Sequence, residues 1–207
     1  MTVKKDRELY IGGSEANYIY MNYETKTFQT WWAYKLAGIP RESPTNRNME
    51  VGTILENEIL DLYEKVNNVK GERGLSKVKG IARANTDYIL KNKVIDVKAS
   101  NSAFEWFLTG TIPIHYRRQL IHYCYVFGLN KASILAYQVD DSLLVNPFQK
   151  LDEKRMVEID VEITDKLIKE HEIRLQYLEK CREKYKFPVK EGFNVLREAR
   201  EDSRNEC

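Results

Sequence analysis

The sequence predicts an α/β domain in which a central mixed β-sheet is flanked by helices. Three observations support this: a strongly periodic helical segment comes first, several runs of β-branched residues follow it, and a second long helical segment comes after them. With 207 residues, the chain has the length of one domain. We expect a single domain over residues 1–207, with a core from about 7 to 190 and a polar tail, 197–207, that is prone to fraying.

Composition indicates a soluble protein without a membrane segment. The chain is 43% hydrophobic and 31% charged, and no apolar run approaches the length that spans a bilayer. The N-terminal seven residues are charged and lack the apolar core of a secretory signal. Three widely spaced cysteines form no disulfide framework, which favours a reducing, cytoplasmic setting. A net charge of +2 does not by itself indicate nucleic-acid binding, which would need a localised basic channel.

The N-terminal third is expected to be helical. Residues 14–23 are predicted to form a first helix capped by Ser14, and residues 27–37 a second helix that ends near Gly38. The segment 39–48 contains two prolines and polar neighbours, so we interpret it as a loop.

A third helix, over residues 49–66, has the clearest periodicity and carries two acids close to its apolar stripe. A helical wheel places Glu58 nearer the centre of the stripe and Glu56 at its edge, which slightly favours Glu58 as an acid buried for a purpose. The more common outcome for either residue is an ordinary helix-surface acid.

Strands are predicted at 76–90 and 93–99, joined as a hairpin by the polar pair Lys91-Asn92. The simplest register matches Leu90 with Lys93, and it therefore places Asp87 opposite Asp96.

Two carboxylates that face each other are destabilising unless a positive charge lies between them, and a hard divalent cation is the obvious candidate. Because side chains alternate along a strand, Lys98 shares a face with Asp96, whereas Ile95 and Val97 point toward a core. The alternative is an exposed hairpin with a weak surface ion pair between Asp96 and Lys98. The hairpin alone leaves these two interpretations equally supported.

The second half completes the α/β pattern. A helix is predicted over residues 114–127, followed by strands at 132–139 and 155–163 and by a long helix from the cap at Thr164 to about Tyr185.

The helix over 114–127 carries further polar side chains. Gln119 and Tyr123 lie one turn apart on one face of it. His115 and His122 have no acid partner at metal-ligand spacing, so we interpret them as surface or half-buried residues.

Four segments carry a family resemblance. In chain order, Gly52-Thr-Ile-Leu-Glu56, Thr86-Asp87, Asp96-Val97-Lys98 and Gln119-Leu-Ile-His-Tyr123 resemble the motifs of the PD-(D/E)XK nuclease superfamily, the last being the Gln-x-x-x-Tyr motif of its RecB-like branch. The resemblance implies a restriction-endonuclease-like core and, through the Gly-x-x-x-Glu spacing, selects Glu56 over Glu58.

More closely, the chain resembles phage exonucleases of the lambda-exonuclease and YqaJ type. The segment Arg7-Glu-Leu-Tyr-Ile-Gly-Gly-Ser14 is similar to that family's Arg followed by Ile-Gly/Thr-Gly/Ala-Ser, and Trp31 to Pro40 is similar to its next helix and loop. Tyr116-Arg-Arg-Gln119 matches its Tyr-x-x-Gln helix. The resemblance covers roughly residues 7–140.

Three positions depart from the family pattern. Thr86 replaces the usual proline, Asp96 the usual glutamate, and Ile121 a second glutamine. None of these changes removes a required charge, so the resemblance still implies an active enzyme.

The resemblance implies a magnesium-dependent (or manganese-dependent) 5′-to-3′ exonuclease that leaves 3′ overhangs for phage-type recombination. It implies DNA ends and a single-strand annealing protein as partners, and a trimer as the assembly. Two ions would be held by oxygen ligands. The implied residues are Glu56, Asp87, Asp96 and the Val97 carbonyl for metal, Lys98 and Gln119 for catalysis, Tyr123 for support, and Arg7 and Ser14 for the 5′-phosphate and nearby backbone.

Rival interpretations differ in activity or in class. A nuclease of the superfamily with an iron-sulfur cluster would need four cysteine ligands, which the chain lacks. An endonuclease with the same fold, and a non-catalytic DNA-binding module that reuses the scaffold, remain open.

Overall fold

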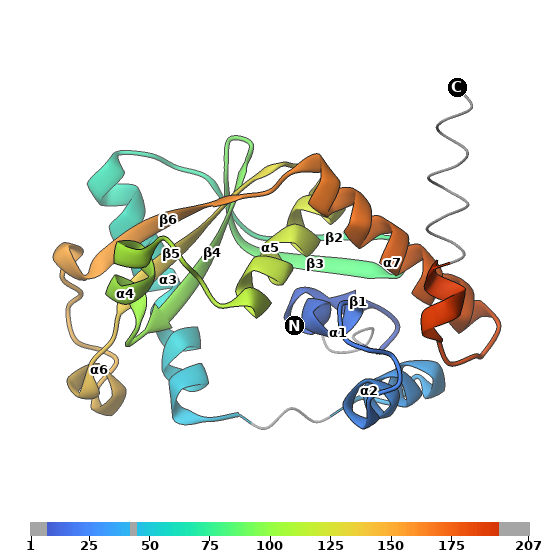
Figure 1. The fold of residues 1–207 in the computed structure, drawn as a ribbon. Helices are drawn as coiled ribbons and strands as arrows, with labels where there is room; N and C mark the ends of the chain where they lie inside the picture. The colour runs from blue at the N-terminus through green and yellow to red at the C-terminus, as the bar shows by residue number, and fades with distance from the viewer. Residues whose placement is uncertain (1–7, 42–44, 195–207) are drawn as a thin grey trace.

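A computed structural model describes residues 8–41 and 45–194 of the chain. Its centre is a six-stranded mixed sheet whose main strand order is β1-β3-β4-β5-β6, with β2 on the other edge of β3 (Figure 1). The pairs β1/β3 and β4/β5 are parallel, and β2/β3, β3/β4 and β5/β6 are antiparallel. The strands are β1 Ile11–Gly12, β2 Glu72–Lys79, β3 Ala82–Leu90, β4 Lys93–Ser100, β5 Lys131–Gln138 and β6 Met156–Glu162.

Helices cover both faces of this sheet. One core layer lies between the sheet and α1, α2, α4, α5 and α7, and a second lies beneath α3 and α6. The helices are α1 Ala16–Ile19, α2 Lys26–Ala37, α3 Arg47–Asn67, α4 Ala103–Thr109, α5 Ile114–Phe127, α6 Asp141–Val145 and α7 Asp165–Glu183, with short 3₁₀ turns η1 at Gly13–Glu15 and η2 at Glu153–Arg155.

Strands β4 and β5 show why both faces are buried. Along β5, Ile134 belongs to the first core and Leu135 to the second, as expected for alternating side chains. Along β4, Ile95 and Val97 face the second core as predicted. Asp96 therefore lies on the opposite face, where it is fully buried.

Most predicted elements are present with shifted ends. The helix predicted over 49–66 begins earlier, at Arg47, because the Asn46 side chain caps it by accepting from Met49 N at 3.0 Å. Helix α5 matches its predicted range, and Gly128 ends it with a φ of 76°.

Two expectations about elements are wrong. The predicted strand 76–90 is two strands, because Gly80 has a φ of 57° and opens a tight turn between β2 and β3. The predicted helix 14–23 is only a 3₁₀ turn and the four-residue α1. Helices α4 and α6 had not been expected.

The two histidines of α5 differ from each other in burial, and one of them differs from the expectation. His115 is exposed as expected, but His122 is fully buried, as is His171. Within the described ranges, no helix is both long and apolar enough to cross a bilayer.

Candidate active site

The candidate site lies where the sheet forks. One edge of β3 pairs with β4 only from Tyr88 to Leu90, and the same edge pairs with β1 at Ala82 and Arg83. Between these two pairings, β3 and β4 separate. The predicted hairpin register holds for the three pairs from Leu90 to Tyr88, and Asp87 is the first residue beyond them.

Asp87 links the two separating strands. Its Oδ2 accepts a hydrogen bond of 2.8 Å from the backbone N–H of Val97. On the other edge of β3, the register would place Gly74 opposite Asp87, but the bridges of the ladder skip this pair and Gly74 has a φ of 62°. A residue with a side chain would be strained at that φ, so the glycine permits the local irregularity beside Asp87.

Asp96 is the most buried acid of the site. Its Oδ1 accepts from Gln119 Nε2 at 3.2 Å, and its Oδ2 lies 2.6 Å from Lys98 Nζ. Lys98 and Asp96 therefore form a close, largely buried ion pair through Oδ2. Gln119 also donates to Tyr123 Oη at 2.7 Å, so α5 orients Asp96 through two linked side chains.

The electrostatics identify one cluster. Burial raises the pKa of Asp87 to about 8, and the charge of Asp96 adds to the shift while Lys98 opposes it. Burial also raises the pKa of Glu56, which interacts with Lys98 and Asp96. Burial acts to lower the pKa of Lys98, but the charges of Asp96 and Asp87 outweigh it and the pKa is raised.

Helix α3 brings Glu56, and not Glu58, to this cluster. Glu56 is half-buried, whereas Glu58 is exposed and lines a separate groove beside Phe148. The helical wheel favours Glu58 wrongly, because Ile54 and Leu62 shift the centre of the apolar stripe toward it. In the structure, α3 packs through other apolar residues. The fully buried ones are Val51, Leu55, Ile59, Leu60 and Tyr63.

This set of donors fits a hard cation. It offers the carboxylates of Glu56, Asp87 and Asp96 and the Val97 backbone carbonyl, all of them oxygen donors. As the side chains are placed, no three His, Cys, Asp or Glu groups of the described residues are close enough to share an ion. The reason is local: the Lys98 ammonium lies against Asp96, and Asp87 is turned toward Val97 N.

Tyr116 is a neighbour of Lys98 whose role had not been predicted. Its ring centroid lies 5.1 Å from Lys98 Nζ, within the range of a cation–π contact, and Trp106 of α4 packs edge-on against it. Tyr116 lies one turn before Gln119 on α5, and that spacing was the available signal.

A cavity of about 170 Å³ opens next to the cluster. Exposed Ser14 lies on its rim, while Arg7 falls outside the described residues. A Cβ on Gly13 would come within 2.2 Å of Tyr123 Cε1, so backbone and ring close one wall. The lining residues are Tyr10, Gly12, Gly13, Ser14, Arg83, Asn85 and Tyr123.

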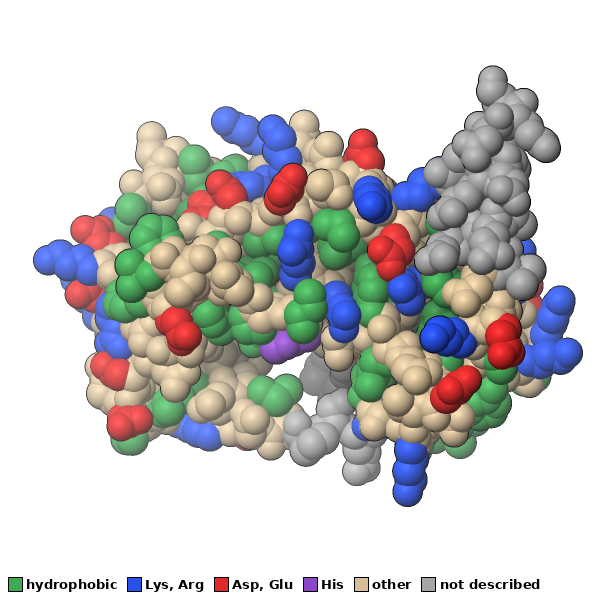
Figure 2. All heavy atoms as spheres, in the orientation of Figure 1, with side chains coloured by type: hydrophobic (Ala, Val, Ile, Leu, Met, Phe, Trp, Pro, Cys, Tyr) green, Lys and Arg blue, Asp and Glu red, His purple; other side chains and the backbone are tan. Residues whose placement is uncertain are grey.

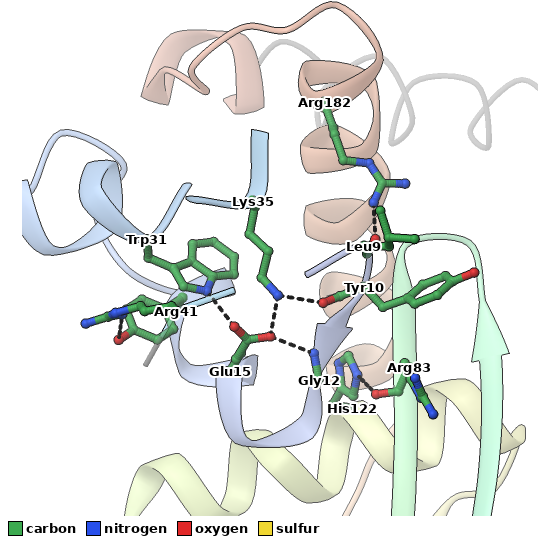
Figure 3. A network of polar contacts seen from close by, with 11 residues as sticks. Leu9, Tyr10, Gly12, Glu15, Trp31, Lys35, Arg41, Arg83, His122 and Arg182 are labelled. Carbon is green, nitrogen blue, oxygen red and sulfur yellow. Dashed lines mark hydrogen bonds and ion pairs between the residues drawn. The ribbon is translucent and has the colours of Figure 1, made fainter. Parts of the chain in front are cut away.

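The turn between β1 and α1 is held by a network around Glu15 (Figure 3). Glu15 Oε2 accepts from Gly12 N at 3.0 Å and from Lys35 Nζ at 2.8 Å, and Oε1 accepts from Trp31 Nε1 at 3.0 Å. Lys35 also donates to the Tyr10 carbonyl at 2.7 Å. This network, which no sequence motif predicts, fixes the wall of the cavity to α2.

Basic side chains are not gathered into one patch on the face drawn in Figure 2. Lys and Arg are interspersed with Asp and Glu, and a hollow opens near the centre of that face (Figure 2). The localised basic channel considered from the net charge is therefore not visible on this face.

Comparisons with known proteins agree on the fold. The family model of the YqaJ-like viral recombinase domain matches residues 4–130. No significant match is found among curated protein sequences.

The crystal structure of an alkaline exonuclease (LHK-Exo) from Laribacter hongkongensis has a TM-score of 0.69 at 18% identity, covering 94% of this chain and 95% of that one. The same exonuclease in complex with dAMP gives 0.69 at 19%, covering 95% and 97%. A phage related exonuclease from Haemophilus somnus 129PT gives 0.60 at 13%, covering 86% and 95%. These similarities confirm the restriction-endonuclease-like fold that the motifs implied.

Proposed function

Because the chain belongs to the YqaJ-like viral recombinase family, we propose that it is a metal-dependent exonuclease that hydrolyses the 5′-ended strand of linear duplex DNA. The observation that carries this proposal is the meeting of Glu56, Asp87, Asp96 and Lys98 at the fork between β3 and β4. Buried acids with raised pKa values beside a lysine are typical of functional sites. The cavity next to them suits the end of a strand.

Asp87, Asp96, Glu56 and the Val97 carbonyl are the residues that would hold magnesium or manganese, with two ions as our proposal. A divalent ion supplies Lewis acidity, a more acidic bound water and charge relief at the phosphate. For Asp96 to bind an ion, the Lys98 ammonium, now 2.6 Å from Oδ2, would turn toward the substrate.

Lys98 is the residue that we expect to orient or deprotonate the attacking water and to stabilise negative charge on the scissile phosphate. The Tyr116 ring limits where its ammonium can move. Gln119 acts as a positioning residue, because it donates to both Asp96 and Tyr123.

Direction would come from recognition of the 5′ end. Ser14 lies at the cavity, and the resemblance assigns Arg7 to the 5′-terminal phosphate. A protein with the same fold has been solved with dAMP, a nucleoside monophosphate. We further propose that the product is a 3′ overhang for a single-strand annealing protein, and that the active assembly is a homotrimer.

One assay tests the activity. Linear duplexes with a 5′ phosphate or a 5′ hydroxyl, and covalently closed circular DNA, are incubated with the protein in Mg²⁺ or in EDTA. We expect mononucleotides and loss of the 5′-labelled strand from linear DNA in Mg²⁺ only. Digestion of closed circles would indicate an endonuclease, and binding without cleavage in any metal would indicate a non-catalytic module.

A further inference from the structure

Lys98 and a divalent ion would compete for the same carboxylate oxygen. The Lys98 ammonium lies 2.6 Å from Asp96 Oδ2, and the two side chains are 18% and 0% exposed, so little water screens the pair. Carboxylate oxygens of this kind are also the ligands that a hard cation prefers. Two positive charges against one oxygen repel each other, so the ammonium must leave Asp96 for an ion to bind there.

The acids that attract Lys98 are the same acids that would hold the ion. Asp96 forms the ion pair, and the charges of Asp87 and Glu56 also interact with Lys98. An ion bound by these three carboxylates would neutralise the charge that holds the ammonium in place. The displaced ammonium then needs a partner that is not a metal ligand, because a largely buried charge without a partner is costly.

Tyr116 is placed to be that partner. The centroid of its ring lies 5.1 Å from Lys98 Nζ, inside the range of roughly 6 Å for a cation–π contact. Among the described residues, Lys98 has Asp96 as its one ion-pair partner and Tyr116 as its one cation–π partner. The lysine stem is flexible, so rotation about its terminal bonds can move the ammonium from the first partner toward the second.

The ring of Tyr116 is held in place by its own neighbours. Trp106 of α4 packs edge-on against it, with 5.6 Å between the ring centroids, and the His115 ring centroid is 4.1 Å away. Tyr116 N donates to the Pro113 carbonyl at 3.0 Å, which fixes the backbone in the first turn of α5. A ring with a fixed position can receive the ammonium without a rearrangement of the helices.

We propose that Tyr116 receives the Lys98 ammonium when a divalent ion binds Asp96, and that this exchange sets the metal affinity of the site. The inference rests on the proposed metal-dependent function and adds to it a positioning residue. The ring acts through Lys98, so its effect on metal affinity should vanish when the ammonium is absent. The hydroxyl takes no part in the exchange, so phenylalanine should replace tyrosine.

The test is isothermal titration calorimetry of the full-length protein with Mn²⁺ and with Mg²⁺, in the absence of DNA. The binding heat that Asp96→Asn abolishes reports the site. We expect Lys98→Met to bind the ion at least about tenfold more tightly than the wild type, because the competing charge is gone. Tyr116→Leu should bind it about fivefold more weakly, whereas Tyr116→Phe keeps the ring face and should stay within about twofold of the wild type.

A double variant separates this exchange from a structural role of the ring. In the Lys98→Met background, Tyr116→Leu should change the metal affinity less than about twofold, because the ring has no ammonium to receive. The matched control is Phe127→Leu, which removes from the same helix a half-buried ring whose centroid lies 5.8 Å from Lys77 Nζ. This control should bind the ion like the wild type.

Equal affinities of the wild type, Lys98→Met and Tyr116→Leu would overturn the inference and leave the metal site standing. Equal weakening by Tyr116→Leu with and without Lys98 would also overturn it, because the ring would then act on the fold. If circular dichroism shows that Lys98→Met is unfolded, equal affinities of Tyr116→Leu and Tyr116→Phe overturn it. A wild type that binds neither ion more tightly than Asp96→Asn contradicts the proposed metal-dependent function as well.

Discussion

At the scale of single residues, the site depends on a lysine held among acids. Lys98 is largely buried, and its ammonium contacts Asp96 on one side and faces the Tyr116 ring on the other. A cation in this position offsets the repulsion between Asp87 and Asp96. The same residue is therefore needed both for the electrostatics of the cluster and, in the proposed reaction, for the water and the phosphate.

Lys98→Ala should reduce the cleavage rate at least about a hundredfold, within the range that general acid–base groups contribute, while DNA binding persists. Cleavage of a 5′-labelled linear duplex and fluorescence anisotropy measure the two properties. Lys91→Ala, at the turn of the same hairpin, is the matched control and should cut at the wild-type rate. Full activity of Lys98→Ala would remove this lysine from the reaction.

Residue-level prediction succeeded only where the pattern was local. The hairpin register that follows from the two turn residues holds from Leu90 to Tyr88, but the predicted pair of Asp87 with Asp96 is not formed, because the strands separate there and Asp87 accepts from Val97 N instead. The choice between Glu56 and Glu58 failed on the wheel, because a helix packed on one sheet face has an apolar stripe whose centre depends on its partner. Only the motif spacing selected Glu56.

At the scale of elements, the long helices are set by caps that the sequence shows directly. Thr164 caps α7 by accepting from Leu167 N at 3.3 Å, and Thr25 caps α2 in the same way from Phe28 N. Short elements escaped prediction for the opposite reason. Helices α4 and α6 have seven and five residues, too few for a periodic pattern.

Thr164→Ala should lower the free energy of unfolding by about 1 kcal/mol, because one N–H of the first turn loses its acceptor. Urea unfolding followed by circular dichroism would show a lower midpoint with an unchanged slope. Thr164→Ser keeps the hydroxyl and should remain close to the wild type. Equal midpoints for the alanine and serine variants would show that the cap contributes nothing to stability.

At the scale of the whole molecule, four elements meet at the two buried histidines. Tyr20 next to α1, His171 of α7, His122 of α5 and the Arg83 carbonyl of β3 form one hydrogen-bonded chain. Burial lowers the pKa of His122 to about 4 and lowers the pKa of His171 well below its usual value. Arg118 and Arg174 stack on Tyr20, so a further positive charge there is unfavourable.

Acid should therefore destabilise the fold before most carboxylates titrate. Unfolded histidines bind protons near pH 6.5 and these two bind them only at lower pH, so the unfolded state holds more protons in between. The contribution of the two histidines to the free energy of unfolding should fall as pH drops from about 6.5 toward 4, by up to about 1.4 kcal/mol per pH unit for each histidine. Asp87 offsets part of this loss, because its raised pKa of about 8 means that the folded state holds a proton there that the unfolded state lacks.

Proton NMR separates the histidines, since the chain has only three. The imidazole signals of His122 and His171 should not titrate above about pH 5, whereas the signal of exposed His115 should. Burial and the nearby Lys98 lower the pKa of His115, so its midpoint should lie below 6.5. Two titrating signals near pH 6.5 would contradict the buried, neutral pair.

The fork of the sheet could not be predicted from sequence, because it joins residues that are far apart in the chain. The sequence pattern predicts a helix from residue 14 but no strand before it. The two-residue β1 gains its strand character only from Ala82 and Arg83 of β3. Likewise, the residues that line the cavity come from the segment around β1, from β3 and from α5. No single sequence motif therefore contains the cavity.

Strand β1 also has a practical consequence for anyone who prepares this protein. The strand begins at Ile11, so only eleven residues would separate a fusion partner attached before Met1 from Gly12, which lines the cavity together with Gly13. If the cavity binds a DNA end as proposed, a bulky domain on so short a tether would compete with that end for the same space. Purification handles belong at the opposite terminus, and discrepancies between differently tagged preparations should first be traced to this placement.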